Sequence, residues 1–341
     1  MPISHKNDTM SASAFQFYRT FVPTLRGLND PVVLSFDNTT FANAYATDPT
    51  TLPHHFIHSG NFFSPPYSKK PELRTKERVL LLQEQLVNDQ TDGLMTLNVP
   101  VNGDFKTPYW KRVKADRMKA LETSLEAALW AKENAQRPDL LYAGFEVGTF
   151  RDARYIFERA LNAGLTKLSA GFGLFSRLAK FRSEDRVKQF EVLAAYNQLL
   201  SEFGDAQFHA SGGSSFNALE LLACANVTSA DGSSAVIAGL AYGSVLTASG
   251  RLVRADKLGE WTCACELCSS KNPLDVLYEL KRSPEARARH NVHMVRLSEA
   301  RINDALENNT IAELTQQRLV EYDKQELWRC YAIVSEKLPR E

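Results

Sequence analysis

Cys263, Cys265 and Cys268 lie within six residues of one another, and His290 follows 22 residues after Cys268. Such crowding suits a metal better than a disulfide framework, because one ion can take several thiolates from a tight turn. Three thiolates and one imidazole form the closed tetrahedral ligand set of structural Zn²⁺. We therefore expect a structural zinc ion here, with His293 as the alternative fourth ligand and three reduced thiols as the alternative without metal.

A second group of polar and glycine residues lies near the ends of apolar runs. It comprises His58, Ser59, Gly60, Asn98, Glu146, Gly148, Gly171, Gly173, His209 and Asp231. Carboxylates and amides can bind a purine edge, and glycines let backbone amides approach a flat ligand closely. Structural interpretations compete: Gly171 and Gly173 could relieve crowding at a turn, His209 could be a core histidine, and Asp231 could cap the next segment.

Short apolar runs alternate with helical patterns from residue 31 onward. The predicted strands span residues 31–36, 55–58, 94–99, 140–147, 165–171, 206–210 and 227–231. Helical patterns lie between them, around residues 118–129, 155–161, 187–200 and 217–225. This alternation predicts a parallel sheet closed into a (β/α)8 TIM barrel, with an open doubly wound sheet as the alternative. In such a barrel, chemistry sits where strands end and helices begin.

The alternation ends after residue 231. A stretch rich in Gly and Ser extends to residue 257, and the cysteine cluster and helical patterns around 274–280 and 302–322 follow. We expect three parts: an N-terminal tail and lead-in over residues 1–25, a catalytic barrel over 26–250, and a zinc-binding subdomain with C-terminal helices over 251–341.

Composition excludes several classes of protein. Hydrophobic residues make up 44% of the chain and charged residues 23%, which excludes wholesale disorder. Forty basic side chains balance forty acidic ones, so a polyanion must be held by a local patch. The longest apolar stretch, 235–246, is too short for a membrane span, and the amino terminus lacks the apolar core of a secretory signal. We expect a cytoplasmic protein without a membrane partner, with Cys224 and Cys330 as packed thiols.

Several motifs resemble one family. The segments Asp231–Ser234, Leu246–Gly250, Cys263–Cys268 and Arg289–Asn291 resemble the carboxy-terminal half of the tRNA-guanine transglycosylases, the queuine and archaeosine tRNA-ribosyltransferases, and their DpdA-like relatives that act on DNA. The resemblance covers residues 30–320, most strongly after residue 205. It implies a (β/α)8 barrel with a Cys3His zinc site. It also implies exchange of guanine in nucleic acid for a 7-deazaguanine such as preQ0, without breakage of the sugar-phosphate chain.

The resemblance also implies roles for single residues. The family's nucleophile is an aspartate in a Ser-Phe-Asp-Ser-like context, which matches Ser229-Ala-Asp231. Its Asp-Ser-Gly-Gly-Phe-like run aligns with residues 58–62, so His58 stands where the family has a proton-transferring aspartate. Asn98 aligns near the family's base-reading aspartate, and Glu146-Val-Gly148 aligns with its Val-Gln-Gly.

The chemistry of base exchange can be argued physically. Displacing a purine from C1′ builds positive charge on the sugar, and a carboxylate on the opposite face can trap the sugar covalently. The leaving guanine needs a proton, so we expect His58 to face it, with Glu146 as the alternative. A target nucleotide inside a duplex must first be flipped out, and phosphate contacts must offset the cost. Candidate contacts are Arg282, Arg287 and Arg289, then Arg251 and Arg254, and then Lys111, Arg112, Lys114 and Arg117.

Three functions follow from these patterns. The favoured one is a DNA guanine transglycosylase, because the base-reading motifs depart from those of the tRNA enzymes and no added RNA-binding module is evident. The second is a tRNA guanine transglycosylase. The third is a noncatalytic nucleic-acid-binding or partner subunit, suggested by the departures at His58 and Asn98. Since members of the family often pair near the zinc insert, we expect a homodimer or a helper subunit.

Overall fold

The computed structural model describes residues 14–20, 25, 30–35, 53–59, 75–101, 109–171, 183–212, 218–263 and 265–335. Eight parallel strands form a closed barrel in sequence order, which confirms the predicted (β/α)8 barrel over the open sheet. The strands are β1 (Gln16–Thr20), β2 (Val32–Ser35), β3 (His55–His58), β4 (Thr91–Met95), β5 (Leu141–Phe145), β6 (Lys167–Gly171), β7 (Gln207–Ser211) and β8 (Ser229–Gly232).

The barrel begins earlier than the sequence predicted. Strand β1 lies within residues 1–25, the segment expected to be a tail and lead-in, and it pairs with both β2 and β8 to close the barrel. The register places Tyr18 of β1 opposite Asp231 of β8. The sequence pattern missed β1 because the strand has only five residues and three of them, Gln16, Arg19 and Thr20, are polar.

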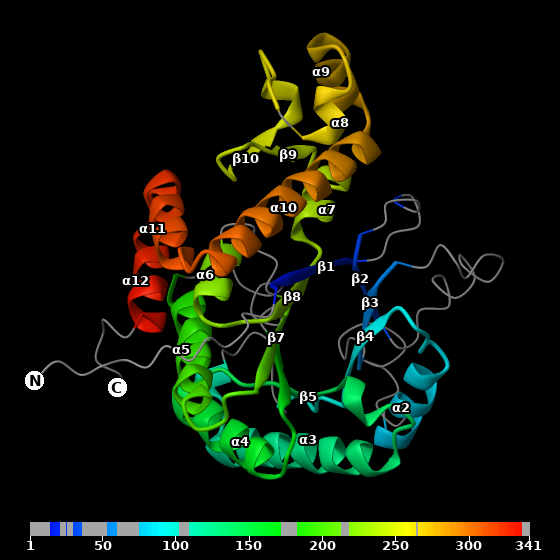
Figure 1. Ribbon diagram of the computed structural model, residues 1–341, viewed down its shortest axis with the longest axis vertical. Coiled ribbons are helices and arrows are strands. Elements are labelled where there is room, and N and C mark those ends of the chain that lie inside the picture. The colour runs from blue at the N-terminus through cyan, green and yellow to red at the C-terminus, as the bar shows by residue number, and fades with distance from the viewer. Residues whose placement is uncertain are drawn as a thin grey trace, which may run out of the picture.

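A helix follows each strand from β3 to β8; those after β3 to β6 surround the strands, whereas the helix after β8 lies toward the lobe (Figure 1). The helices are α2 (Lys76–Glu84), α3 (Lys114–Asn134), α4 (Phe150–Asn162), α5 (Ser183–Leu200), α6 (Leu219–Cys224) and α7 (Ser234–Leu240). Helix α4 shows how the sequence specifies one of these helices. The side chain of Thr149 caps its first turn by accepting a hydrogen bond from the N–H of Asp152. Ile156 and Phe157 lie on its buried face.

A layer of aromatic side chains fills the barrel below its mouth. Tyr18, Phe56, Tyr142 and His209 come from β1, β3, β5 and β7, the alternate-strand arrangement of barrel interiors. The rings of Phe56 and His209 are stacked, with centroids 4.0 Å apart and planes 8° from parallel. The edges of Tyr18 and Tyr142 approach the ring of His209 at centroid distances of 6.0 Å. This layer fixes His209 in one orientation.

The chain after β8 forms a lobe and returns to the barrel (Figure 1). The lobe contains an antiparallel pair of strands, β9 (Ser244–Leu246) and β10 (Leu252–Arg254), and the helices α8 (Glu266–Ser269) and α9 (Pro273–Arg282). Helix α10 (Pro284–Glu307) runs from the lobe along α7. Helices α11 (Ile311–Tyr322) and α12 (Gln325–Val334) then pack on α6 and α5. Within the described ranges, no helix combines the length and the apolar character needed to cross a membrane.

Helices α7 and α10 approach each other closely at Gly239. A Cβ atom on Gly239 would lie 2.5 Å from the backbone nitrogen of Ala288 and 2.7 Å from its Cα. Real Cβ atoms do not come so close to backbone, so one helix would have to move. Glycine at this position therefore sets the distance between the lobe's long helix and the segment that follows β8.

We predict that Gly239→Ala destabilises the protein by about 1–3 kcal/mol, because the new methyl group overpacks a contact between two backbones. Gly259→Ala is the matched control, since a Cβ there meets nothing within 4 Å. Thermal and urea unfolding of the two variants provide the comparison. Equal stability of both variants and the wild type would show that α7 and α10 can separate freely.

Candidate active site and metal centre

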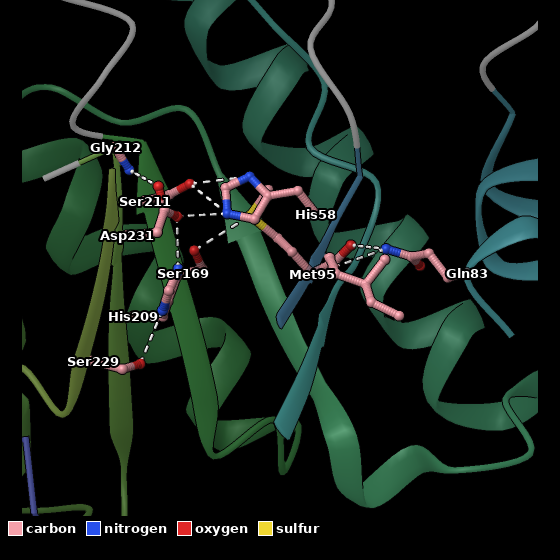
Figure 2. A network of polar contacts seen from close by, with 10 residues as sticks. His58, Gln83, Met95, Ser169, His209, Ser211, Gly212, Ser229 and Asp231 are labelled. Carbon is pink, nitrogen blue, oxygen red and sulfur yellow. Dashed lines mark hydrogen bonds and ion pairs between the residues drawn. The ribbon is translucent and has the colours of Figure 1, made fainter. Parts of the chain in front are cut away.

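The candidate active site lies at the carboxyl ends of three strands. Alternate residues of a strand share a face, so His209 and Ser211 of β7 point into the barrel together, as do Ser229 and Asp231 of β8. His58 ends β3 and reaches the same place from across the barrel, as Figure 2 shows. The fold thus brings together His58 and Asp231, which the sequence assigned to catalysis, and adds His209 to them.

The carboxylate of Asp231 is held by three partners. Its Oδ2 atom lies 2.6 Å from Nε2 of His58 and 2.9 Å from Nε2 of His209. Its Oδ1 atom accepts a hydrogen bond from the backbone N–H of Gly212 at 2.8 Å. Gly212 has a φ of 73°, a left-handed conformation that favours glycine and that directs this N–H toward the carboxylate. Asp231 does not cap a helix here; it faces the barrel interior.

The environment of Asp231 favours its charged form. Burial alone would raise the pKa of this carboxyl, but the proximity of His58 and the hydrogen bonds from both histidines outweigh burial and hold the pKa well below its usual range. Burial lowers the pKa of His209, against the opposing effect of Asp231. At neutral pH the site therefore contains an ionised carboxylate beside a neutral, buried imidazole.

Serine hydroxyls orient both histidines. Ser229 Oγ lies 2.8 Å from Nδ1 of His209, where it can donate to the unprotonated nitrogen and leave the Nε2 proton for Asp231. Ser211 Oγ lies 3.1 Å from Nε2 of His58. The sequence placed Ser211 in the polar run from His209 to Gly213 but gave neither serine a role, although each stands two residues from His209 or Asp231 on the same strand face. The side chain of His58 keeps 18% of its surface exposed and is the member of the group that faces the mouth.

Asn98 lies three residues past the end of β4 and is also buried. Among the described residues, its side-chain Oδ1 has no hydrogen-bond partner. A buried acceptor left unpaired costs about 1–3 kcal/mol, so this oxygen is suited to accept a hydrogen bond from a ligand. Gly148 follows β5, and Gly171 at the end of β6 pairs with Ser211. Ser59 directly follows β3 and is buried, whereas Gly60 and Gly173 lie outside the described residues.

Glu146 is held in place by two donors. Its Oε1 accepts from Nη1 of Arg112 at 3.0 Å, and its Oε2 accepts from the backbone N–H of Val101 at 2.6 Å. Burial raises the pKa of Glu146, and both donors act in the opposite direction. With both oxygens occupied, the side chain ties the segment after β4 to Arg112. This arrangement favours His58 over Glu146 as the group that exchanges a proton.

Several predicted phosphate contacts are engaged within the protein instead. Arg287 is buried and donates to the carbonyl oxygens of Gly239 and Leu280. Other arginines of the predicted set form ion pairs: Arg112 with Glu146, Arg117 with Asp152, Arg254 with Asp256 and Arg289 with Glu285. Arg282 is exposed and lies over the ring of Tyr278. Arg287 therefore has a structural role, whereas Arg254 and Arg282 are exposed and Arg289 is partly exposed.

The four predicted metal ligands converge in the lobe. The ligand atoms of Cys263, Cys265, Cys268 and His290 all lie within 4.8 Å of one another, and His293 is not among them. Nδ1 of His290 is 3.5 Å from Sγ of Cys265 and 3.4 Å from Sγ of Cys268. A tetrahedral ion with bonds of about 2.3 Å to sulfur and about 2.1 Å to nitrogen separates such atoms by about 3.5 Å. The cluster thus has the donors and spacing that zinc requires.

The second nitrogen of His290 fixes the orientation of the ring. Nε2 lies 2.8 Å from the carbonyl oxygen of Leu246, so the ring proton belongs on Nε2 and the lone pair of Nδ1 faces the thiols. The next residue, Asn291, is fully buried. It accepts from the N–H of Leu246 at 2.7 Å and donates to the carbonyl oxygens of Ala235 and Ser244. These two residues of α10 join the metal cluster to β9 and to the start of α7.

We predict that Asn291→Ala destabilises the protein by about 1–3 kcal/mol, because the N–H of Leu246 loses its buried acceptor. Asn134→Ala is the control, since that exposed amide only donates to Trp130 of its own helix. Denaturant unfolding measures both. A loss no larger than that of the control would show that α10 does not depend on this amide.

A scan against protein-family models and a search of curated proteins find no match to this chain. In the part of the chain that the structure describes, two clusters of side chains could bind a metal ion or support chemistry. The first is His58, His209 and Asp231 at the mouth, and the second is the Cys3His group in the lobe.

Proposed function

We propose that this protein is a glycosyltransferase that exchanges guanine in nucleic acid for a 7-deazaguanine, with Asp231 as the nucleophile. The observation that carries the proposal is the geometry around Asp231: a buried carboxylate at the barrel mouth has its Oδ2 2.6 Å from Nε2 of His58, an imidazole that is partly open to solvent. A carboxylate can attack an anomeric carbon, and an adjacent imidazole can move the proton that the reaction requires.

The first step couples the two groups. A carboxylate oxygen of Asp231 forms a bond to C1′ while the bond from C1′ to N9 of guanine breaks, and the electron pair leaves with the base. Ester formation neutralises the carboxylate that lies 2.6 Å from Nε2 of His58. His58, acting in its imidazolium form, then gives its Nε2 proton to the departing guanine and becomes a neutral imidazole.

The second step reverses the first with a different base. The incoming 7-deazaguanine attacks C1′ through N9 and gives up its proton to His58, and the ester bond to Asp231 breaks. The carboxylate is regenerated with the N–H of Gly212 on Oδ1. The unpaired Oδ1 of Asn98 supports this assignment, because an N–H group on the base edge would satisfy a buried acceptor.

The sequence favours DNA over tRNA as the polymer. His58 and Asn98 align at or near positions where the tRNA-guanine transglycosylases that this chain resembles have aspartates. Different residues at the positions that contact the base are consistent with a different substrate. A tRNA guanine transglycosylase is the second candidate. Both share the chemistry at Asp231, so the modified base in DNA and in tRNA from cells with and without the gene distinguishes them.

We infer that the Cys3His cluster binds zinc with a structural role. The donor set and the sulfur-to-nitrogen distances fit the ion, and four protein ligands leave no coordination position open for a substrate. When bound, zinc would cross-link the three cysteines to α10. The contacts of His290 and Asn291 would then carry that constraint to β9 and to the start of α7.

We predict that Asp231→Asn lowers guanine exchange by more than about 10³-fold, because an amide is a poor nucleophile for C1′. Incorporation of labelled guanine or 7-deazaguanine into DNA and tRNA measures the loss. Asp92→Asn is the matched control, because it makes the same change on β4 at the far end of the barrel. Equal incorporation by wild type and Asp231→Asn would reject the nucleophile. Absence of incorporation by either would favour a noncatalytic binding subunit.

We predict that Cys265→Ala removes the zinc ion and lowers the unfolding temperature, since structural zinc of this type contributes on the order of 10 kcal/mol. Cys224→Ala, which changes a cysteine outside the cluster, retains the zinc. Mass spectrometry of the metal content and thermal unfolding provide the readouts. A stable Cys265→Ala chain with unchanged zinc would exclude this site.

A further inference from the structure

The ligand atoms at the barrel mouth also have the arrangement of a metal site. Nε2 of His58, Nε2 of His209 and Oδ2 of Asp231 lie within 4.8 Å of one another, and both nitrogens lie within 2.9 Å of the same oxygen. An octahedral ion with bonds of about 2.1 Å at right angles separates neighbouring ligand atoms by about 3 Å. His209 already stands at this separation. His58 stands a few tenths of an ångström closer and is the more exposed of the two.

Two of the three ligands have the supporting contact that metal sites use. Ser229 Oγ lies 2.8 Å from Nδ1 of His209 and can accept its proton when Nε2 binds an ion. The N–H of Gly212 occupies Oδ1 of Asp231 and leaves Oδ2 for the ion. Ser211 Oγ lies 3.1 Å from Nε2 of His58 and 3.4 Å from Nδ1, so its contact with Nε2 would be replaced by the ion. Two imidazoles and one carboxylate that leave positions open are typical of first-row transition metals.

We propose that His58, His209 and Asp231 bind one divalent first-row transition metal ion, and that this ion and the nucleotide exclude each other from the site. In a neutral ring the proton shifts from Nε2 to Nδ1, and the freed Nε2 binds the ion. An imidazolium form of His58 would in addition release one proton to solvent. The second half of the proposal rests on the proposed function. An Oδ2 lone pair bound to a metal is not available for C1′, so the ion would inhibit base exchange reversibly.

The test of binding is a Co²⁺ titration of the full chain after its thiolate cluster has been filled with zinc. We expect weak visible bands of Co²⁺ bound to nitrogen and oxygen, without intense thiolate charge-transfer bands, at one ion per chain. His209→Ala and His58→Ala should each abolish these bands. Ser229→Ala, which keeps all three ligands, should weaken binding about 10- to 100-fold.

His54→Ala is the matched control, because its exposed imidazole also lies beside an aspartate, with Nδ1 3.0 Å from Asp92. This variant should bind Co²⁺ as the wild type does. If the zinc-filled wild type binds no Co²⁺, the proposed metal site does not exist. If the wild type and His58→Ala bind Co²⁺ equally, the binding is adventitious and the proposed site is also overturned. His58 is partly exposed, so its replacement keeps the test valid if His209→Ala fails to fold.

Inhibition is measured separately from binding. Co²⁺ should lower base exchange in proportion to occupancy of the site, and a chelator that leaves the zinc in place should restore it. If the rate of base exchange is unchanged or higher when Co²⁺ fully occupies the site, the ion and the nucleotide do not exclude each other. A chain that binds Co²⁺ at these residues but never exchanges bases would support the metal site and reject the proposed function.

Discussion

The architecture of the barrel mouth depends on one buried charge. An ionised carboxylate away from water is costly unless donors surround it, and Asp231 is only 4% exposed. Its partners come from β3, from β7 and from the turn after β7, so the charge is stabilised only when these strands hold the observed register. The stability of the mouth and the charged form of Asp231 therefore depend on the same contacts.

His209 links this charge to the barrel core. Its ring stacks on Phe56 and completes the aromatic layer, while its Nε2 reaches Asp231. A histidine that is both a core residue and a hydrogen-bond partner has little freedom to move. His58 has the opposite character, because it is partly exposed and contacts the same oxygen. The two imidazoles therefore have different roles: His209 positions the carboxylate, and His58 can exchange protons with a ligand.

The lobe extends the same constraint outward. Helix α10 carries a ligand of the Cys3His cluster at His290, and its neighbour Asn291 hydrogen-bonds to Ala235 at the start of α7. Gly239 allows the backbones of α7 and α10 to touch. Since α7 follows β8 directly, a rigid lobe limits the movement of the segment next to Asp231. A metal far from the mouth would in this way support the geometry of the site.

The sequence predicted the elements with strong local signals. The β-then-α alternation predicted the closed barrel, which the structure confirms. The spacing of the three cysteines and His290 predicted that these four side chains would converge, and their ligand atoms do lie within 4.8 Å of one another. Strand β1 was missed because a five-residue strand with three polar residues has no clear pattern. The pairing of His209 with Asp231 and of Glu146 with Arg112 was not predictable, because it depends on contacts between strands and loops distant in sequence. Only a three-dimensional structure shows which donors reach a carboxylate.

The proposed base exchange requires a covalent bond between Asp231 and C1′ of the sugar. Peptide mapping by mass spectrometry can detect this bond after the protein is incubated with guanine-containing DNA or tRNA in the absence of an incoming base. We expect one acid-stable adduct of nuclease-trimmed nucleic acid, located on Asp231 and released by added 7-deazaguanine. An adduct on any other residue, or base exchange that proceeds without an adduct on Asp231, would contradict the proposed role of Asp231.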